Sequence, residues 1–207
     1  MSAAENKVFV SSTPPFCLRR DFLHPDIIRD LLAFIDANQA RFVPSRIGYG
    51  ERGHVDAKSR VSLVYPVSSP LAESIGKQMG ALKQVVCDLV GIAPFTLDGV
   101  EVELAVHNEG AFFGRHSDVR DAGPLGQTRK LSGVFYFHAQ PKAFSGGVLR
   151  IYDPDDATYS RAAEIEPNNN SCVFFPPHVP HEVMRVNCPS RRFMDSRFAL
   201  NFWYLGV

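Results

Sequence analysis

Three His-x-Asp pairs in this chain place an imidazole and a carboxylate two residues apart, a combination that can bind a metal ion. The pairs are His24/Asp26, His54/Asp56 and His116/Asp118. Residues two apart on an extended segment face the same way, so each pair offers two ligands on one side. Since the pattern occurs three times, the surrounding sequence has to decide which pair is a metal site.

The first two pairs have simpler explanations than a metal. Asp26 stands at the start of a predicted helix, where the helix dipole favours an acidic side chain. His54 and Asp56 lie in the glycine-rich polar stretch 46–60, which suits a lid over a site better than a rigid set of ligands. The same stretch matches G-x-G-x-x-G at 48–53, but it lacks the strand and helix that a dinucleotide site requires.

The third pair has a partner further along the chain. His116 and Asp118 follow a predicted strand and the aromatic run at 111–114, and His181 begins another strand-like run. His178 is the rival third ligand; three residues apart on an extended chain the two histidines face opposite ways, so only one of them is expected to serve. We prefer His181 because it begins a clear strand. Two imidazoles and a carboxylate that leave other metal positions open are the arrangement that suits non-haem iron(II) oxygenases.

The last strand-like run, 197–205, carries an arginine among apolar residues. By alternation Arg197, Ala199, Asn201 and Trp203 share one face, and Phe198, Leu200 and Phe202 share the other. Both faces are apolar enough to be buried, and a buried arginine needs a partner, for which a carboxylate matches its planar fork. That carboxylate is either a structural acid of the protein or part of a ligand.

The apolar periodicity changes along the chain. Residues 25–35 and 70–91 have the spacing of amphipathic helices, with Pro25 and Pro70 in first-turn positions and Gly91 as a stop. From residue 95 onward, short strand-like runs separated by Gly, Pro and Asn turns occupy 100–106, 131–138, 148–153, 172–175, 182–186 and 197–205. Two helices followed by many short strands predict helices packed against a β-sandwich or jelly roll.

Composition limits the classes of partner. The chain has 207 residues, 45% of them hydrophobic, and its 22 basic and 22 acidic residues cancel, which argues against nucleic-acid and membrane-surface binding. It lacks a long apolar run and a basic-then-apolar start, and its four cysteines are scattered. We therefore expect a single-domain cytoplasmic protein with reduced thiols, whose oligomeric state the sequence leaves open.

Four segments in this order resemble a known family. His116-x-Asp118, SGGVLRIYD (145–153), CVFFPPHVPHEVMRV (172–186) and RFALNFWYLG (197–206) are similar to the iron(II)/2-oxoglutarate-dependent oxygenases, and within them to the prolyl-hydroxylase branch. The resemblance implies an α+β, mainly β fold: a double-stranded β-helix, or jelly roll, with N-terminal helices packed against it. Residues 1–207 would form one dioxygenase domain, with 1–95 as helical support and lid and 96–207 as the catalytic core.

The resemblance also implies roles for the site residues. His116, Asp118 and His181 would bind Fe(II), and Arg197 would bind the distal carboxylate of the co-substrate 2-oxoglutarate. With O2, such an enzyme hydroxylates an unactivated C–H bond and releases succinate and CO2; ascorbate is a further candidate cofactor. The carboxylate at Asp118 implies hydroxylation, since halogenating relatives lack it. The branch acts on prolyl residues of proteins and on free amino acids or other small metabolites.

This chain departs from the family pattern around 2-oxoglutarate. Arg197 lies sixteen positions after His181, a longer gap than usual, so Arg191 and Arg192 are alternatives. We prefer Arg197 because it stands in the same relation to the end of its strand as the family arginine.

Other departures concern the polar groups near that arginine. His107 and Phe135 stand where prolyl hydroxylases often have tyrosines, and the alternation predicts that Tyr136 points the other way. Asn201, on the Arg197 face, is the expected compensating contact to the co-substrate. Arg60 and Tyr65, after the predicted lid, are candidates to face substrate.

Two other classes of function remain as alternatives. One is a catalytically silent jelly roll that binds a ligand, which has no need to keep the metal ligands and the arginine together. The other is a zinc hydrolase, but Glu182 beside His181 should point away from the metal, and no other glutamate stands in a general-base motif.

Overall fold

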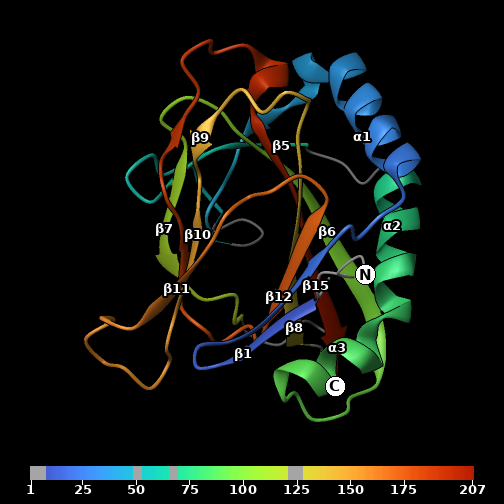
Figure 1. Ribbon diagram of the computed structural model, residues 1–207, viewed down its shortest axis with the longest axis vertical. Helices are drawn as coiled ribbons and strands as arrows, with labels where there is room; N and C mark the ends of the chain where they lie inside the picture. The colour runs from blue at the N-terminus through green and yellow to red at the C-terminus, as the bar shows by residue number, and fades with distance from the viewer. Residues whose placement is uncertain (1–7, 49–52, 66–69, 121–127) are drawn as a thin grey trace, which may run out of the picture.

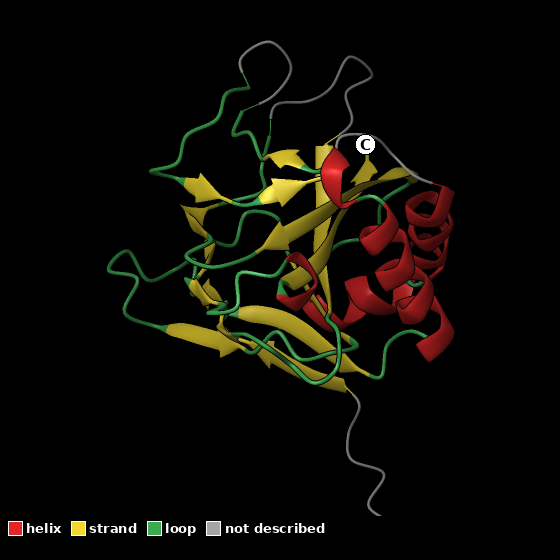
Figure 2. Ribbon diagram, turned by 90° about the horizontal axis from the view of Figure 1, so that it is seen from above, coloured by secondary structure: helices red, strands yellow, loops and turns green. Residues whose placement is uncertain are grey.

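The computed structural model describes residues 8–48, 53–65, 70–120 and 128–207. Figures 1 and 2 show the helices stacked along one face of a large twisted sheet, with a smaller sheet on the opposite side. Most of the predicted lid motif, residues 49–52, lies outside the described residues. This arrangement confirms an α+β, mainly β jelly roll with helices packed on one side.

Helix α1 (Pro25–Ala37) begins where the sequence predicted. His24 is its N-cap, and the His24 ring accepts a hydrogen bond from the backbone amide of Asp26. Ile28, Leu31 and Ile35 form its buried face. The first His-x-Asp pair is therefore an exposed helix start, as the dipole argument indicated.

The prediction of one helix over 70–91 was wrong, because the segment forms α2 (Pro70–Ala81) and α3 (Lys83–Val90). At the junction the Leu82 amide donates to the carbonyl of Met79, three residues back, which interrupts the α-helical pattern. The break lets α2 pack on β6 while α3 packs on β1, β2 and β12. Gly91 ends α3 with a φ of 72°, as predicted for a glycine stop.

The larger sheet has the strand order β1-β2-β12-β8-β15-β6-β5-β3 among the described residues. Its strands are β1 (Val8–Ser12), β2 (Pro15–Arg20), β3 (Val43–Pro44), β5 (Leu63–Val64), β6 (Leu97–His107), β8 (Thr128–Phe137), β12 (Ser171–Phe175) and β15 (Arg197–Gly206). β15 lies in the middle, antiparallel to both β6 and β8. It therefore has neighbours on both edges, and its residues are buried or half-buried on both faces, as its apolar pattern predicted.

The smaller sheet has the order β11-β10-β13-β7-β4 over the same described ranges. Its strands are β4 (Arg60–Val61), β7 (Phe112–His116), β10 (Leu149–Tyr152), β11 (Ala162–Ile165) and β13 (His181–Val183). A separate pair joins β9 (Ser145–Gly146) to β14 (Val186–Asn187), so the run predicted at 182–186 is divided between β13 and β14. Short 3-10 turns occupy Gln39–Arg41 and Phe193–Asp195.

The first 95 residues contribute strands to both sheets as well as helices, which the sequence periodicity did not predict. β2 adds to the larger sheet by pairing with β12, where Cys17 faces Phe174, and β4 extends the smaller sheet by pairing with β7. These pairings join segments far apart in the sequence. The catalytic core predicted for residues 96–207 is thus completed by N-terminal strands.

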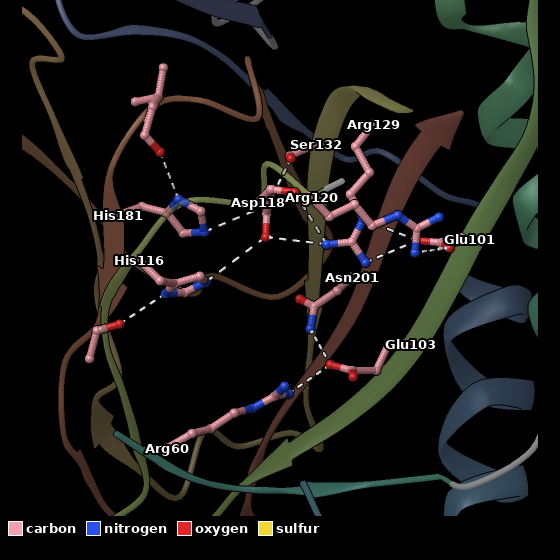
Figure 3. Close-up of polar contacts among 12 residues, drawn as sticks. Arg60, Glu101, Glu103, His116, Asp118, Arg120, Arg129, Ser132, His181 and Asn201 are labelled. Atoms are coloured by element: carbon pink, nitrogen blue, oxygen red, sulfur yellow. Dashed lines mark hydrogen bonds and ion pairs between the residues drawn. The ribbon is translucent and has the colours of Figure 1, made fainter. Parts of the chain in front are cut away.

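Two apolar layers hold the structure together. One lies between the helices and the larger sheet and includes Leu31, Ile75 and Phe135. The other lies between the two sheets and includes Tyr136, Ile151 and Val173. Beside this inner layer lies a cavity lined by polar side chains, which include His116, Asp118, His181 and Asn201 (Figure 3). Arg197 lines the same cavity.

Candidate metal and co-substrate site

The structure brings His116, Asp118 and His181 together. His116 ends β7 and faces His181, the first residue of β13, across the pairing of these two strands, and Asp118 follows β7 directly. One ligand atom from each side chain lies within 4.8 Å of the other two. His178 is exposed, and His181, which was preferred because it begins a strand, is the histidine that lies beside the pair.

Each histidine is held with one nitrogen facing the carboxylate. The Nδ1 atoms of His116 and His181 lie 2.9 Å from the backbone carbonyls of Gly114 and Val179, to which they donate. This leaves the two Nε2 atoms 3.9 and 3.7 Å from oxygens of Asp118 (Figure 3). Backbone acceptors of this kind fix the tautomer that presents an Nε2 lone pair to a metal.

The protonation states also suit a metal. Burial and the neighbouring His181 lower the pKa of His116 to about 3, so its ring is neutral at pH 7. Burial alone would raise the pKa of Asp118, but His181, His116 and the Ser132 hydroxyl lower it below its ordinary value. A neutral imidazole beside a carboxylate is the donor set that binds Fe(II).

A second layer of side chains orients Asp118, and the sequence analysis did not find it. The Ser132 hydroxyl donates to Oδ2 of Asp118 over 2.7 Å. Arg129 lies 3.8 Å from Oδ1, pairs with Glu101 at 2.9 Å, and stacks on Trp203 with 3.7 Å between guanidinium carbon and ring centroid. These contacts join residues on β6, β8 and β15, so no local motif could reveal them.

Arg197 is buried without a carboxylate partner among the described residues. Its side chain is 1% exposed, its Nε donates to the Gly147 carbonyl at 2.9 Å, and its Nη1 lies 3.3 Å from Nδ1 of His107. The structural-acid explanation of this arginine therefore fails within the part of the chain that the structure describes. A buried cation in this state calls for an anionic ligand.

Three buried polar atoms gather around this guanidinium. Nη2 of Arg197, the hydroxyl of Tyr136 and Nε2 of His107 have no hydrogen-bond partner within the described ranges. The Arg197 guanidinium lies 4.8 Å from the Tyr136 ring centroid, and burial raises the pKa of Tyr136, which keeps the phenol protonated. A ligand carboxylate would accept hydrogen bonds from both the guanidinium and the phenol, so the residues fit 2-oxoglutarate.

The predicted orientations of Tyr136 and Phe135 were wrong. In the pairing of β8 with β15, Tyr136 lies opposite Ala199, which places it on the face of Arg197 between the sheets. Phe135 lies opposite Leu200 and packs on the helix side. Tyr136 therefore supplies a tyrosine beside Arg197, where the sequence had predicted that none would be present.

The structure decides some of the other candidates for contact with 2-oxoglutarate and leaves one open. Arg191 and Arg192 are exposed and lie outside the cavity. Asn201 lines the same cavity as Arg197, but its amide nitrogen donates to Glu103 at 3.1 Å. A contact between Asn201 and 2-oxoglutarate therefore stays a prediction.

A cavity connects the metal ligands to Arg197 and opens into a groove. The cavity is lined by His116, Asp118, His181, His107, Arg197, Asn201, Arg60 and Glu103, with apolar contributions that include Phe113 and Trp203. The adjoining groove has a volume of about 1270 Å³ and extends over β3, β5 and β6. It exceeds the upper end of the range of about 300–1,000 Å³ that is typical of small-ligand pockets.

The remaining sequence predictions can be placed. His54 is exposed on an isolated β-bridge with Ile47, away from the metal ligands. Glu182 accepts from the Tyr152 hydroxyl and lies 3.5 Å from Arg150, so it points away from the metal as expected. All four cysteines are free and buried. Among the described residues, no helix is long and apolar enough to cross a membrane.

Gly147 is the backbone position on which Arg197 depends most. Its φ is 67°, and a Cβ there would lie 2.6 Å from Cδ of Arg197. We expect Gly147→Ala to destabilise the fold by about 2 kcal/mol and to weaken co-substrate binding, because strain and a clash both displace the guanidinium. Urea unfolding and calorimetry measure the two effects. Gly99→Ala is the matched control, because the new methyl group would lie in open space. Equal free energies of unfolding and equal co-substrate affinities in the two variants would contradict the prediction.

The buried histidines predict an acid-sensitive fold. Burial holds the pKa of His107 well below 6.5 and that of His116 at about 3. Both rings stay neutral in the folded state and take up protons only on unfolding, so stability is lost as the pH falls below about 6.5. The loss reaches up to about 2 kcal/mol per histidine at pH 5. The free energy of unfolding, measured with urea on metal-free protein, should change less between pH 7 and pH 5 in His116→Asn than in wild type. An equal change in both proteins would contradict this assignment.

Comparison with known proteins agrees with this geometry. The model of the 2OG-Fe(II) oxygenase superfamily matches residues 102–205. An uncharacterized PKHD-type hydroxylase of Synechocystis sp. is 39% identical over 130 residues, which are 59% of this chain; the chain spans 42% of that relative's length.

Solved structures share the fold. A prolyl-4-hydroxylase of Pseudomonas putida has a TM-score of 0.65 and 23% identity, covering 95% of this chain and 94% of its own. A prolyl hydroxylase of Trichoplax adhaerens, solved with a peptide fragment of a hypoxia-inducible factor, has a TM-score of 0.65 and 17% identity, with coverages of 92% and 83%. The family match runs from β6 through β15 and so includes the three metal-ligand candidates and Arg197. The chain belongs to the 2OG-Fe(II) oxygenase superfamily.

Proposed function

We propose that this protein is an Fe(II)- and 2-oxoglutarate-dependent hydroxylase that acts on a prolyl residue or a proline-like amino-acid substrate. The observation that carries the proposal is the pairing of two sites in one cavity. His116, Asp118 and His181 offer a metal three ligands, and the buried Arg197 offers an anion a cation without a carboxylate partner in the described structure. A jelly roll that only binds a ligand has no need for both.

The chain's own residues position the reactants. His116, Asp118 and His181 would hold Fe(II), while Arg197 and Tyr136 would bind the distal carboxylate of 2-oxoglutarate and fix its orientation. When bound together, Fe(II) and 2-oxoglutarate supply O2 activation: one oxygen atom enters the substrate C–H bond, the other enters succinate, and CO2 leaves. Ser132 and Arg129 keep Asp118 in place, and the apolar layer behind Tyr136 keeps water from the carboxylate site.

The substrate class is supported by the relatives and by the groove. The two solved structures described above are prolyl hydroxylases by name, and one was solved with a peptide fragment. The groove beside the metal ligands is large enough for a chain segment. The four free, buried thiols suit the reducing cytoplasm, where we place the reaction.

The test is product formation. The Fe(II)-loaded protein is incubated with 2-oxoglutarate, ascorbate and either capped peptides that contain one central proline or free L-proline, under 18O2. We expect one of the two substrate classes to gain a single 18O atom in step with succinate release. Succinate formation without any oxygen incorporation into either class would contradict the proposed substrate, whereas no consumption of 2-oxoglutarate would contradict the hydroxylase itself.

A further inference from the structure

Opposite the metal ligands, a charged network lines the same cavity (Figure 3). Arg60 is 8% exposed, and its Nη2 donates to Oε1 of Glu103 at 2.7 Å while its Nε donates to the Ser62 hydroxyl at 2.9 Å. Asn201 donates to the same Oε1 of Glu103 at 3.1 Å. The Arg60 guanidinium also stacks on Phe113, with 4.7 Å from its central carbon to the ring centroid. The network is therefore fixed by bonds on several sides before any substrate arrives.

Two atoms of this network are left for a ligand. Nη1 of Arg60 has no hydrogen-bond partner within the described ranges, and neither has Oε2 of Glu103. Both side chains line the cavity that holds His116 and Asp118 as well as the groove that leads out of it. The wall thus presents one hydrogen-bond donor and one acceptor side by side.

The charge of the network indicates which ligand it suits. Arg60 and Glu103 form an ion pair at 2.7 Å, so their charges largely cancel at the wall. A free amino acid carries a full ammonium and a full carboxylate, which this neutral pair would bind less strongly than isolated opposite charges would. The amino acid would also lose the hydration of both charged groups on binding. The backbone of a polypeptide is neutral, and one residue of an extended chain presents its N–H and its C=O toward the same side, which complements a donor beside an acceptor.

The size of the groove supports the same class of ligand. The groove of about 1270 Å³ continues past Arg60 and Glu103 along β5 and β6 and includes Val64, Tyr65 and Val102 in its lining. A free amino acid would leave most of this volume filled with water. An extended chain would fill it and bring the backbone N–H and C=O of one residue to the wall.

We propose that Arg60 and Glu103 form a binding site for the backbone N–H and C=O of one residue of a polypeptide substrate. The substrate carbonyl accepts from Nη1 of Arg60, and the substrate N–H donates to Oε2 of Glu103. The two bonds would set which residue of the bound chain lies over the metal, so the pair determines specificity. This inference rests on the proposed hydroxylase function.

Glu103→Gln is the sharpest test, because it changes one atom at the wall. Arg60 and Asn201 both donate to Oε1, so they hold the glutamine carbonyl oxygen in that place and direct its NH2 group to the position of Oε2. The acceptor becomes a donor without a change of size. Arg60→Lys is a second variant, which keeps the charge but removes the planar fork. Glu164→Gln is the matched control, since Glu164 pairs with Arg150 at 2.6 Å outside the cavity.

The probe is a pool of capped hexapeptides with one central proline, and the readout is peptide-stimulated succinate formation. We expect KM for the peptides to rise at least about tenfold in Glu103→Gln and in Arg60→Lys, and to stay within twofold in Glu164→Gln. Methylation of the backbone nitrogens of the peptides, one residue at a time, should weaken peptide binding to wild type strongly at one residue. Methylation at that same residue should not weaken peptide binding to Glu103→Gln any further. This scan in wild type keeps the test decisive if a variant does not fold.

The failures are distinguishable. Equal peptide KM values for wild type and Glu103→Gln would overturn the proposed backbone-binding site, as would stimulation by free L-proline but not by the peptides. In both cases 2-oxoglutarate is still consumed, so the proposed hydroxylase stands. Absence of any Fe(II)-dependent consumption of 2-oxoglutarate would overturn the proposed function itself.

Discussion

Replacing Arg197 with alanine is expected to weaken 2-oxoglutarate binding at least about 100-fold, the largest effect of any single change at the co-substrate end of the cavity. The guanidinium is 1% exposed and lacks a carboxylate partner among the described residues, so its charge is reserved for a ligand. Arg197→Lys should recover only part of the loss, because an ammonium cannot donate through a planar fork. Anaerobic calorimetry of the Fe(II)-loaded protein measures the affinities.

The control for this prediction is metal binding. The Arg197 side chain contacts Gly147, His107 and Tyr136 rather than the three metal-ligand candidates, so the alanine variant should still bind Fe(II). Arg192→Ala is the matched arginine variant, because Arg192 is exposed and was the rival candidate. Loss of 2-oxoglutarate affinity in Arg192→Ala but not in Arg197→Ala would show that the co-substrate is bound elsewhere.

Asp118→Asn is expected to weaken Fe(II) binding at least about 100-fold and to abolish turnover. The substitution keeps the size of the side chain but removes the only negative charge among the three ligand candidates. Substitution of groups that merely orient a ligand costs about 10–100-fold in metal affinity, so loss of the charged ligand should cost more. Competition against a fluorescent chelator under anaerobic conditions measures the affinity.

Glu182→Gln serves as the control for that variant. Glu182 directly follows His181, but its carboxylate contacts Tyr152 and Arg150 on the outer side of the sheet. Neutralising it should leave Fe(II) affinity within about twofold. Unchanged metal affinity in Asp118→Asn would contradict the assignment of the metal site.

The metal site was accessible from the sequence because its rules are local. Residues two apart on an extended chain share a face, which paired His116 with Asp118. Residues three apart do not, so only one of His178 and His181 was expected to serve, and the strand that begins at His181 decided between them. The same rule gave a wrong result on β8. Tyr136 and Phe135 are adjacent, both are fully buried, and both faces of the strand are apolar, so the pattern did not reveal which residue faces Arg197.

Contacts between distant segments were not accessible. Glu103 and Arg60 lie 43 residues apart, on strands of different sheets, and neither sits in a motif. Ser132 reaches Asp118 only because β8 lies beside the end of β7 in the folded chain. β1 and β2 were missed for the same reason, since their place in the larger sheet depends on the pairing of β2 with β12.

The measurement that tests the central claim most directly is succinate formation from 2-oxoglutarate under air, without prime substrate, with and without added Fe(II). The account predicts slow turnover in wild type that requires Fe(II) and is lost in both Asp118→Asn and Arg197→Ala. Anaerobic calorimetry on the same samples separates weak turnover from weak binding. Wild-type protein that neither consumes 2-oxoglutarate nor binds it in the presence of Fe(II) would contradict the account.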